Sequence, residues 1–193
     1  MNKKDVIAFF DRLAPQWDAD MIKNDEIIHT ILQNADVQPG ARVLDVACGT
    51  GVMIPYYLEQ GVESVTAIDI SPEMVKIAQG KFPQNNVEIH CGDVETAVFP
   101  YNFDNIVIYN AFPHFPEPER LIRRLSQLLN PGGTLTVAHG MSRAHIDAHH
   151  QGAASRVSIG LMHEDALAAM FRKYLTLTVK LSTDRMYQIA GRA

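Results

Sequence analysis

The 193-residue chain has only two cysteines, Cys48 and Cys91, too few for the disulfide framework that stabilises small secreted domains. Its first residues contain no apolar run of signal-peptide length, and no apolar stretch approaches the roughly 20 residues that cross a bilayer. We therefore expect a cytoplasmic protein without stable insertion into a membrane.

The chain also lacks an excess of basic residues. Its net charge is −5, and lysine and arginine are scattered except on one predicted helix that carries Arg120, Arg123 and Arg124. A nucleic-acid-binding surface normally gathers positive charge on one face, so we expect a small-molecule partner and no nucleic acid. The length and a hydrophobic content of 47% suit one domain spanning residues 1–193.

Short apolar runs alternate with helix-like segments, which is typical of βαβ units in a parallel sheet. The predicted strands are Arg42–Ala47, Ser64–Ile70, Val87–Cys91, Asn105–Asn110 and Thr134–His139. The predicted helices between them are Val52–Gln60, Pro72–Lys81 and Glu117–Leu129. Ser71 is a good N-cap before a proline, and the sequence NPGG at 130–133 predicts a turn.

The two ends depart from this alternation. Asn2–Gln33 is predicted to be amphipathic and helical, and residues 1–35 are assigned as a cap over a core at 36–139. Residues 140–193 are assigned as an acceptor-side segment with a helix at Glu164–Tyr174, followed by strands Thr176–Thr183 and Met186–Arg192. We expect a three-layer α/β/α sandwich with a Rossmann-like, doubly wound, seven-stranded sheet. It should be mostly parallel, with an antiparallel last strand and an antiparallel final edge.

Glycines and acids stand where three predicted strands end, the place where doubly wound sheets bind ligands. Gly49 and Gly51 allow a tight turn and a close approach of a ligand to the backbone. Asp69 suits the vicinal hydroxyls of a ribose, and Asp93 suits the exocyclic amine of a purine. Together these residues predict a nucleoside site.

The glycine loop lacks the third glycine of the G-x-G-x-x-G pattern that binds dinucleotides, because Val52, Met53, Ile54 and Pro55 follow Gly51. Asp45 lies inside the first strand, where a carboxylate suits an ammonium-bearing ligand better than a diphosphate. Both features favour S-adenosylmethionine, which carries an ammonium group and no phosphate. A Rossmann-like domain that binds another nucleotide is the open alternative.

The motifs VLDVACGTG, AIDIS, GDVE, FDNIVIYNAFPHF and LNPGGTLTVAH follow one another as in class I S-adenosylmethionine-dependent methyltransferases, and the chain resembles this family from about Phe9 to His139. FDRLAPQWD at 10–18 resembles the branch of ubiquinone and menaquinone C-methyltransferases. The resemblance implies a cofactor site with Trp17 closing over it, Asp45, Gly49 and Gly51 at the methionine part, Asp69 at the ribose, Met74 and Asp93 at the adenine, Asn110 and Ala111 at the sulfonium, and Ala47, Ile70 and Val94 beside them.

Two departures from related patterns bear on the acceptor. Residues 110–113, NAFP, are not the Asn-Pro-Pro-aromatic motif of adenine and glutamine N-methyltransferases, which argues against those acceptors. FPHFP at 112–116 replaces the glycine-rich, arginine-bearing segment of the quinone methyltransferases. Methylation of a quinone is therefore not supported in detail.

Methyl transfer is an in-line displacement, so the protein must align donor and acceptor, and it needs a base only for a protonated acceptor. His114 follows the fourth predicted strand and is the candidate base or acceptor contact; a histidine that only packs in its loop is the alternative. Further candidates are His139, His145 and His149. If Ser142 caps a helix, His145 and His149 share one face, and with His139 or His114 they form a candidate site for a divalent metal. A solvated polar helix that shapes the acceptor pocket without metal is the alternative.

Three functions follow. The leading hypothesis is a methyltransferase that uses S-adenosylmethionine, yields S-adenosylhomocysteine and methylates a small molecule. The second is a metal-assisted O- or S-methyltransferase, or a metal-binding protein, that uses the histidines between His139 and His150. The third is a module that binds S-adenosylmethionine without catalysis.

Overall fold

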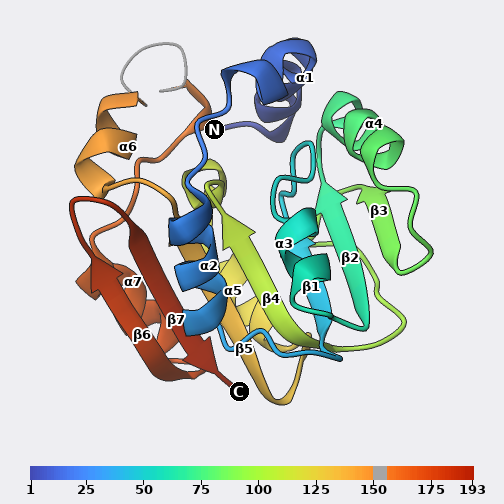
Figure 1. The fold of residues 1–193 in the computed structure, drawn as a ribbon. Coiled ribbons are helices and arrows are strands. Elements are labelled where there is room, and N and C mark those ends of the chain that lie inside the picture. Colours follow the sequence, from blue (N-terminus) through green and yellow to red (C-terminus); the bar gives the residue numbers. More distant parts are fainter. Residues whose placement is uncertain (150–155) are drawn as a thin grey trace.

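A seven-stranded sheet lies between two layers of helices (Figure 1). The structure is a computed structural model that describes residues 1–149 and 156–193, with backbone only for 147–149. The strands are β1 (Arg42–Val46), β2 (Ser64–Asp69), β3 (Val87–Cys91), β4 (Phe103–Tyr109), β5 (Leu129–His139), β6 (Thr176–Ser182) and β7 (Tyr187–Arg192). The helices are α1 (Lys3–Asp20), α2 (Asp25–Asn34), α3 (Ile54–Glu59), α4 (Pro72–Lys81), α5 (Pro118–Ser126), α6 (Arg143–His149) and α7 (Glu164–Phe171), with a 3-10 turn η1 at Phe112–His114.

The strand order is β3-β2-β1-β4-β5-β7-β6. Neighbouring strands from β3 to β5 pair in parallel, whereas β7 pairs antiparallel with both β5 and β6. The antiparallel last strand and the antiparallel final edge of the sheet are therefore confirmed, and the strand at that edge is β6, which pairs with the outer side of β7. The predicted turn at 130–133 lies within β5, where a register shift against β4 accommodates it.

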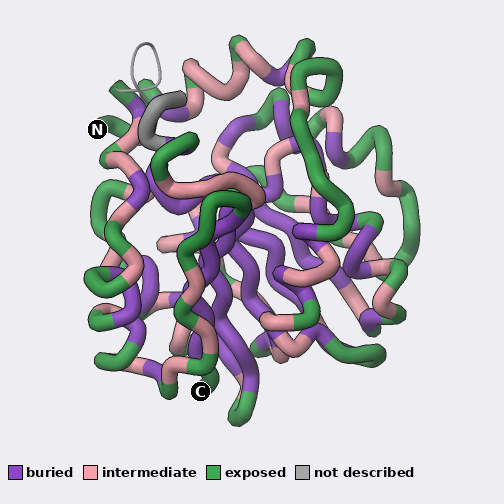
Figure 2. Tube along the Cα trace, turned by 60° about the vertical axis from the view of Figure 1, so that its left-hand side comes forward, coloured by how far each residue is buried: buried purple, intermediate pink, exposed green. Residues whose placement is uncertain are grey.

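The sheet buries both faces, as its apolar strands require. Leu44 of β1 packs in a core with α5 and α7, whereas its neighbour Val43 packs in a second core with α2 and α3. Buried residues accordingly fill the centre of the molecule, and exposed ones lie outside it (Figure 2). Because successive strand residues face opposite sides of the sheet, helices cover both faces and the domain has three layers.

The N-terminal segment forms two helices where the sequence predicted one continuous helical region. Met21 ends α1 in an extended conformation, and the Asn24 side chain caps α2 by accepting from Ile27 N at 3.1 Å. The break lets α1 cross the edge where β2 and β4 end, while α2 packs against a face of the sheet (Figure 1). Among the described residues, no helix combines the length and the apolarity needed to span a membrane.

Candidate cofactor and acceptor site

The loop after β1 has an unusual backbone that opens it toward a ligand. Gly49 and Gly51 have φ angles of 55° and 88°, and Ala47 also has a positive φ, of 55°. A Cβ on Gly51 would lie 2.6 Å from Phe82 Cε2, so the loop closes too tightly there for a side chain. Asn110, at the end of β4, has a φ of 53°. Such strained residues commonly gather at ligand sites.

Asp69 ends β2 and fastens two loops together. Its Oδ2 accepts from Gly49 N and its Oδ1 accepts from Ser71 N, each at 2.8 Å. Burial raises the pKa of Asp69, and the two backbone N–H groups oppose that rise. The Ser71 hydroxyl in turn accepts from Met74 N at 3.2 Å, which confirms the predicted cap of α4. Asp69 thus holds its carboxylate at the cavity wall while it orders the glycine loop.

Asp45 is a buried carboxyl group within β1, with 1% of its surface exposed. Burial and the charge of Asp69 raise its pKa to about 8, although the nearby Tyr57 hydroxyl lowers it. Its Oδ2 has no hydrogen-bond partner in the described part of the chain. A cation at the adjacent loop would relieve this electrostatic penalty.

Asp93 follows β3 and forms an ion pair with Lys3 at the start of α1. The Lys3 ammonium also donates to Glu95 Oε2 at 2.8 Å, and Arg120 donates to Glu95 Oε1 at 2.8 Å. Burial lowers the pKa of Lys3, but its contacts with the two acids raise it above the ordinary value. The acid that the sequence assigns to an adenine amine therefore already binds an amine of the chain itself.

Two further polar contacts hold α1 against the loops that follow β1 and β2. The Ser71 hydroxyl donates to Asp11 Oδ1 at 2.5 Å, and the Thr50 hydroxyl donates to Asp18 Oδ1 at 2.5 Å. Lys81 also donates to Asp18, at 2.8 Å. Helix α1 thus covers the loops at the ends of β1 and β2.

A cavity of about 170 Å³ lies beneath α1. The predicted cofactor residues that line it are Trp17, Ala47, Gly49, Asp69, Ile70, Met74, Asp93, Val94, Asn110 and Ala111. Asp45 and Gly51 do not line it; they lie in the strand and the turn behind it. Residues from five separate segments of the chain therefore meet at one place.

Aromatic rings form another wall of this cavity. The Phe10 ring stands edge-on to Trp17, with ring centroids 5.7 Å apart, and edge-on to His114, at 4.9 Å. His114 Nδ1 lies 2.6 Å from the Val157 carbonyl oxygen. Phe10 and His114 both line the cavity, so the candidate base faces the same space as the candidate cofactor residues.

Comparisons with known proteins agree with this geometry. The methyltransferase domain family matches residues 44–137. The malonyl-[acyl-carrier protein] O-methyltransferase of Acetivibrio thermocellus is 31% identical over 138 residues, 70% of this chain and 49% of that protein. The ubiquinone biosynthesis O-methyltransferase of Xanthomonas campestris is 41% identical over 101 residues, 50% of this chain and 42% of that protein. The chain belongs to the class I S-adenosylmethionine-dependent methyltransferases.

The chain spans about half the length of these two relatives of the methyltransferase family. Among solved methyltransferases, the N-methyltransferase NodS from Bradyrhizobium japonicum in complex with S-adenosylhomocysteine superimposes with a TM-score of 0.75. The superposition covers 97% of this chain and 98% of NodS at 15% identity, which shows a shared fold. The predicted Rossmann-like sandwich is therefore confirmed.

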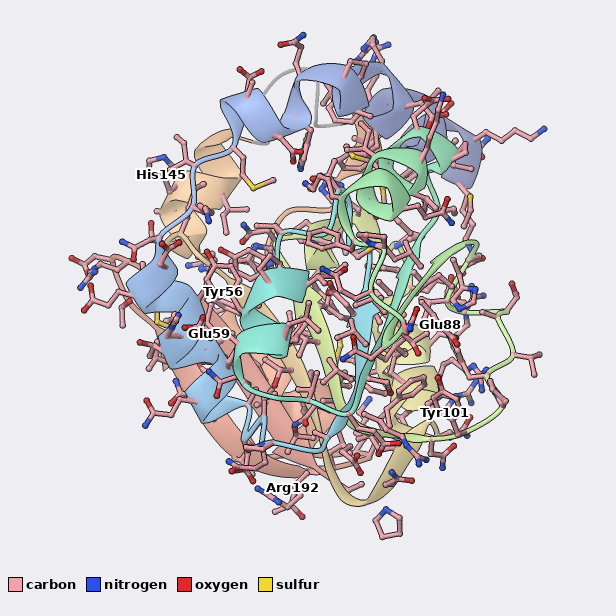
Figure 3. The ribbon with its side chains drawn as sticks, turned by 45° about the vertical axis from the view of Figure 1, so that its right-hand side comes forward. Tyr56, Glu59, Glu88, Tyr101, His145 and Arg192 are labelled. Atoms are coloured by element: carbon pink, nitrogen blue, oxygen red, sulfur yellow. The ribbon has the colours of Figure 1, made fainter. Side chains whose placement is uncertain are left out.

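His139, the last residue of β5, and His145 do not converge on the methyltransferase cavity. His139 is buried against Tyr187, with ring centroids 6.1 Å apart, and does not line the cavity. Ser142 does cap α6, because its Oγ accepts from His145 N at 3.2 Å, but His145 is exposed at the periphery (Figure 3). The His149 side chain and His150 lie outside the described residues. Among those described, no three His, Cys, Asp or Glu side chains come together as a metal site would require.

Sequence reasoning missed several residues of this methyltransferase site. Lys3 and Glu95 line the cavity. Glu95 ends the motif GDVE but was given no role, and no motif marks Lys3, whose contact with Asp93 joins residues 90 positions apart. The carbonyl oxygen of Val157 contacts His114, although the two residues are 43 positions apart in the sequence. The sequence does place Phe10 on the apolar face of the N-terminal helix. That pattern cannot show which surface of the protein this face covers.

Proposed function

We propose that this chain binds S-adenosylmethionine in the cavity beneath α1 and transfers its methyl group to a small-molecule acceptor. The observation that carries the proposal is the convergence of Gly49, Asp69, Asp93 and Asn110, from four strand ends, on one cavity. Membership of the methyltransferase family and the names of the two relatives support it. The donor would supply an activated methyl group on a sulfonium.

The residues fit this donor on structural grounds. The buried Asp45 carboxyl group behind the glycine loop suits the field of an ammonium group. Gly49 lines the cavity without a side chain that could obstruct a ligand, and a Cβ there would lie 3.8 Å from Trp17 Nε1. We assign Asp69 to the ribose hydroxyls and Asp93 to the adenine amine. Met74 would pack on the adenine face.

We assign the acceptor to the wall formed by Phe10, Trp17, Tyr109, His114 and Phe115. These side chains suit an acceptor with an apolar body, and α1, which carries Phe10 and Trp17, would exclude water from the reacting atoms. The alignment of donor and acceptor under α1 is the main catalytic contribution that we assign to the chain.

Donor binding can be followed through Trp17, the single tryptophan of the chain, which lines the cavity. Asp69→Asn keeps the shape of the side chain but removes its charge. We expect it to weaken binding of S-adenosylmethionine roughly 10- to 150-fold, the range for hydrogen bonds to charged groups. Asp184→Ala, in the exposed β6–β7 turn, is the matched control and should bind normally. Wild-type protein that binds no donor would refute the proposal.

Catalysis is tested separately from binding. Incubation with methyl-labelled donor and a cell extract should yield a labelled small product, and Asp69→Asn should reduce its rate of formation. Donor binding by a wild-type protein that labels nothing would instead favour a non-catalytic binding module.

A further inference from the structure

The contact between His114 and Val157 determines where the imidazole carries its proton. The Val157 carbonyl oxygen can only accept a hydrogen bond, and it lies 2.6 Å from His114 Nδ1. Nδ1 must therefore carry the hydrogen, so the neutral ring has its lone pair on Nε2. A backbone carbonyl that fixes the histidine tautomer in this way is a common feature of histidines that take up a proton.

Two further contacts hold the ring in place. Ile159 N donates to the Pro113 carbonyl oxygen at 2.9 Å, so the segment around Val157 is tied to η1 at two points. The His114 ring also packs edge-to-face with Phe10 of α1, at an interplanar angle of 84°. Side chains fixed by packing and hydrogen bonds can hold a reacting group in a productive geometry.

We propose that His114 is the general base of this site, that the Val157 carbonyl is its positioning group, and that the acceptor class is a hydroxyl group on an apolar molecule. This inference rests on the proposed function and deepens it. A hydroxyl such as a phenol, with a pKa near 10, stays protonated at neutral pH and needs a base. A carboxylate or a tertiary amine already presents a lone pair and needs none.

The step balances in atoms and charge. The acceptor oxygen forms a bond to the methyl carbon, and the carbon–sulfur bond breaks with its electron pair going to sulfur. The hydroxyl proton moves to His114 Nε2, which leaves an imidazolium ring with Nδ1–H still donating to Val157. The proton then leaves to water after the product departs.

The asparagine variant separates the two roles of the ring. In His114→Asn, the side-chain amide can still donate to the Val157 carbonyl, but no basic nitrogen remains. His114→Ala removes both the base and the hydrogen bond. His90→Asn, at an exposed position on β3, is the matched control.

The probes are phenol and 4-nitrophenol with methyl-labelled S-adenosylmethionine, measured from pH 6 to pH 9. With phenol at pH 7, we expect His114→Asn to lower kcat/KM by roughly 10²- to 10⁴-fold, with donor affinity unchanged, and to regain rate as the pH rises. With the more acidic 4-nitrophenol, which ionises in this range, the variant should lose far less. The other ionisable side chains that line the cavity are Lys3, Lys23, Cys48, Asp69, Asp93, Glu95 and Tyr109, and they are the same in both proteins.

Three outcomes would overturn this inference. Full activity of His114→Asn with loss of activity in His114→Ala would show that the ring only holds the structure together. Equal losses with the two probes would show that no proton is transferred to the ring. If wild-type protein methylates neither phenol yet labels a product from a cell extract, the hydroxyl class is wrong while the proposed methyltransferase function stands.

Discussion

The buried Asp45 predicts how donor binding depends on pH. Its pKa is raised to about 8, chiefly by burial and then by the charge of Asp69, so the carboxyl group is mostly protonated in the free protein at pH 7. An ammonium group at the glycine loop favours the ionised form. Binding of S-adenosylmethionine should therefore release a proton from Asp45, and affinity should rise with pH until the carboxyl group is ionised beforehand.

The size of this effect follows from linkage. Below the raised pKa, each pH unit changes the ionised fraction of Asp45 about tenfold, equivalent to about 1.4 kcal/mol. We expect the association constant to increase roughly eight- to tenfold from pH 6 to pH 7. It should level off near pH 8, because Asp45 is then half ionised and an α-amino group begins to lose its own proton near that pH.

Titration calorimetry with S-adenosylmethionine at pH 6, 7 and 8, in buffers of different ionisation enthalpy, gives both the affinity and the number of protons released. Asp45→Asn, which cannot titrate, should bind with nearly constant affinity between pH 6 and pH 7 and release no proton. Trp17 fluorescence provides an independent binding curve, since this ring lines the cavity. A wild-type affinity that is flat from pH 6 to pH 7, or a variant with the same slope as wild type, would refute this reasoning.

Further predictions concern stability and the loops around the cavity. Because the pKa of Asp45 is higher in the folded state, the unfolded chain releases this proton at lower pH, and the free energy of unfolding falls as pH rises from about 4 toward 8; in urea unfolding, the free energy of unfolding of Asp45→Asn should gain on that of wild type by about 1.4 kcal/mol per pH unit between pH 5 and pH 7. Lys3→Met frees Asp93, so donor affinity at low salt should rise roughly two- to fivefold, and a fall in affinity would show that Lys3 helps to bind the donor. Gly51→Ala should destabilise the protein more than Gly49→Ala, by on the order of 1 kcal/mol in thermal or urea unfolding, because both have positive φ but only the new Cβ at 51 meets another side chain within 3 Å; equal losses would contradict this.

The fold was predictable where local pattern and tertiary structure agree. Buried parallel strands are continuous apolar runs, so β1 to β4 lie close to their predicted positions. The end of α1 was missed because the apolar spacing continues through the break, although Asn24 followed by Asp25 and Glu26 carries the cap and first-turn acids of a new helix. The position of β7 inside the sheet depends on long-range pairing, which no local pattern encodes.

The candidate site was predictable to the extent that it follows from strand ends. Parallel strands bring their carboxyl ends to one edge, so an acid or glycine that leaves a strand can be assigned there without knowing the rest of the structure. The aromatic wall and the Val157 carbonyl depend on how α1 and the segment after residue 155 pack over that edge. The histidine pattern after β5 stays a prediction, because spacing on a helix does not show which way the helix faces and the His149 side chain lies outside the described residues.

The buried charges near the cavity link the stability of the fold to the binding of the donor. Asp45 and Asp69 lie close enough that the charge of Asp69 raises the pKa of Asp45, and both carboxyl groups are buried, which disfavours their ionised forms. The backbone N–H groups of Gly49 and Ser71 compensate Asp69, but Asp45 Oδ2 lacks such a partner among the described residues. The free protein relieves this penalty by keeping a proton on Asp45, and we expect a cationic donor to replace that proton. We therefore expect the buried Asp45 carboxyl group, which lowers stability at neutral pH, to favour a positively charged ligand over a neutral nucleoside, because the nucleoside would leave the proton in place and gain no electrostatic stabilisation from Asp45.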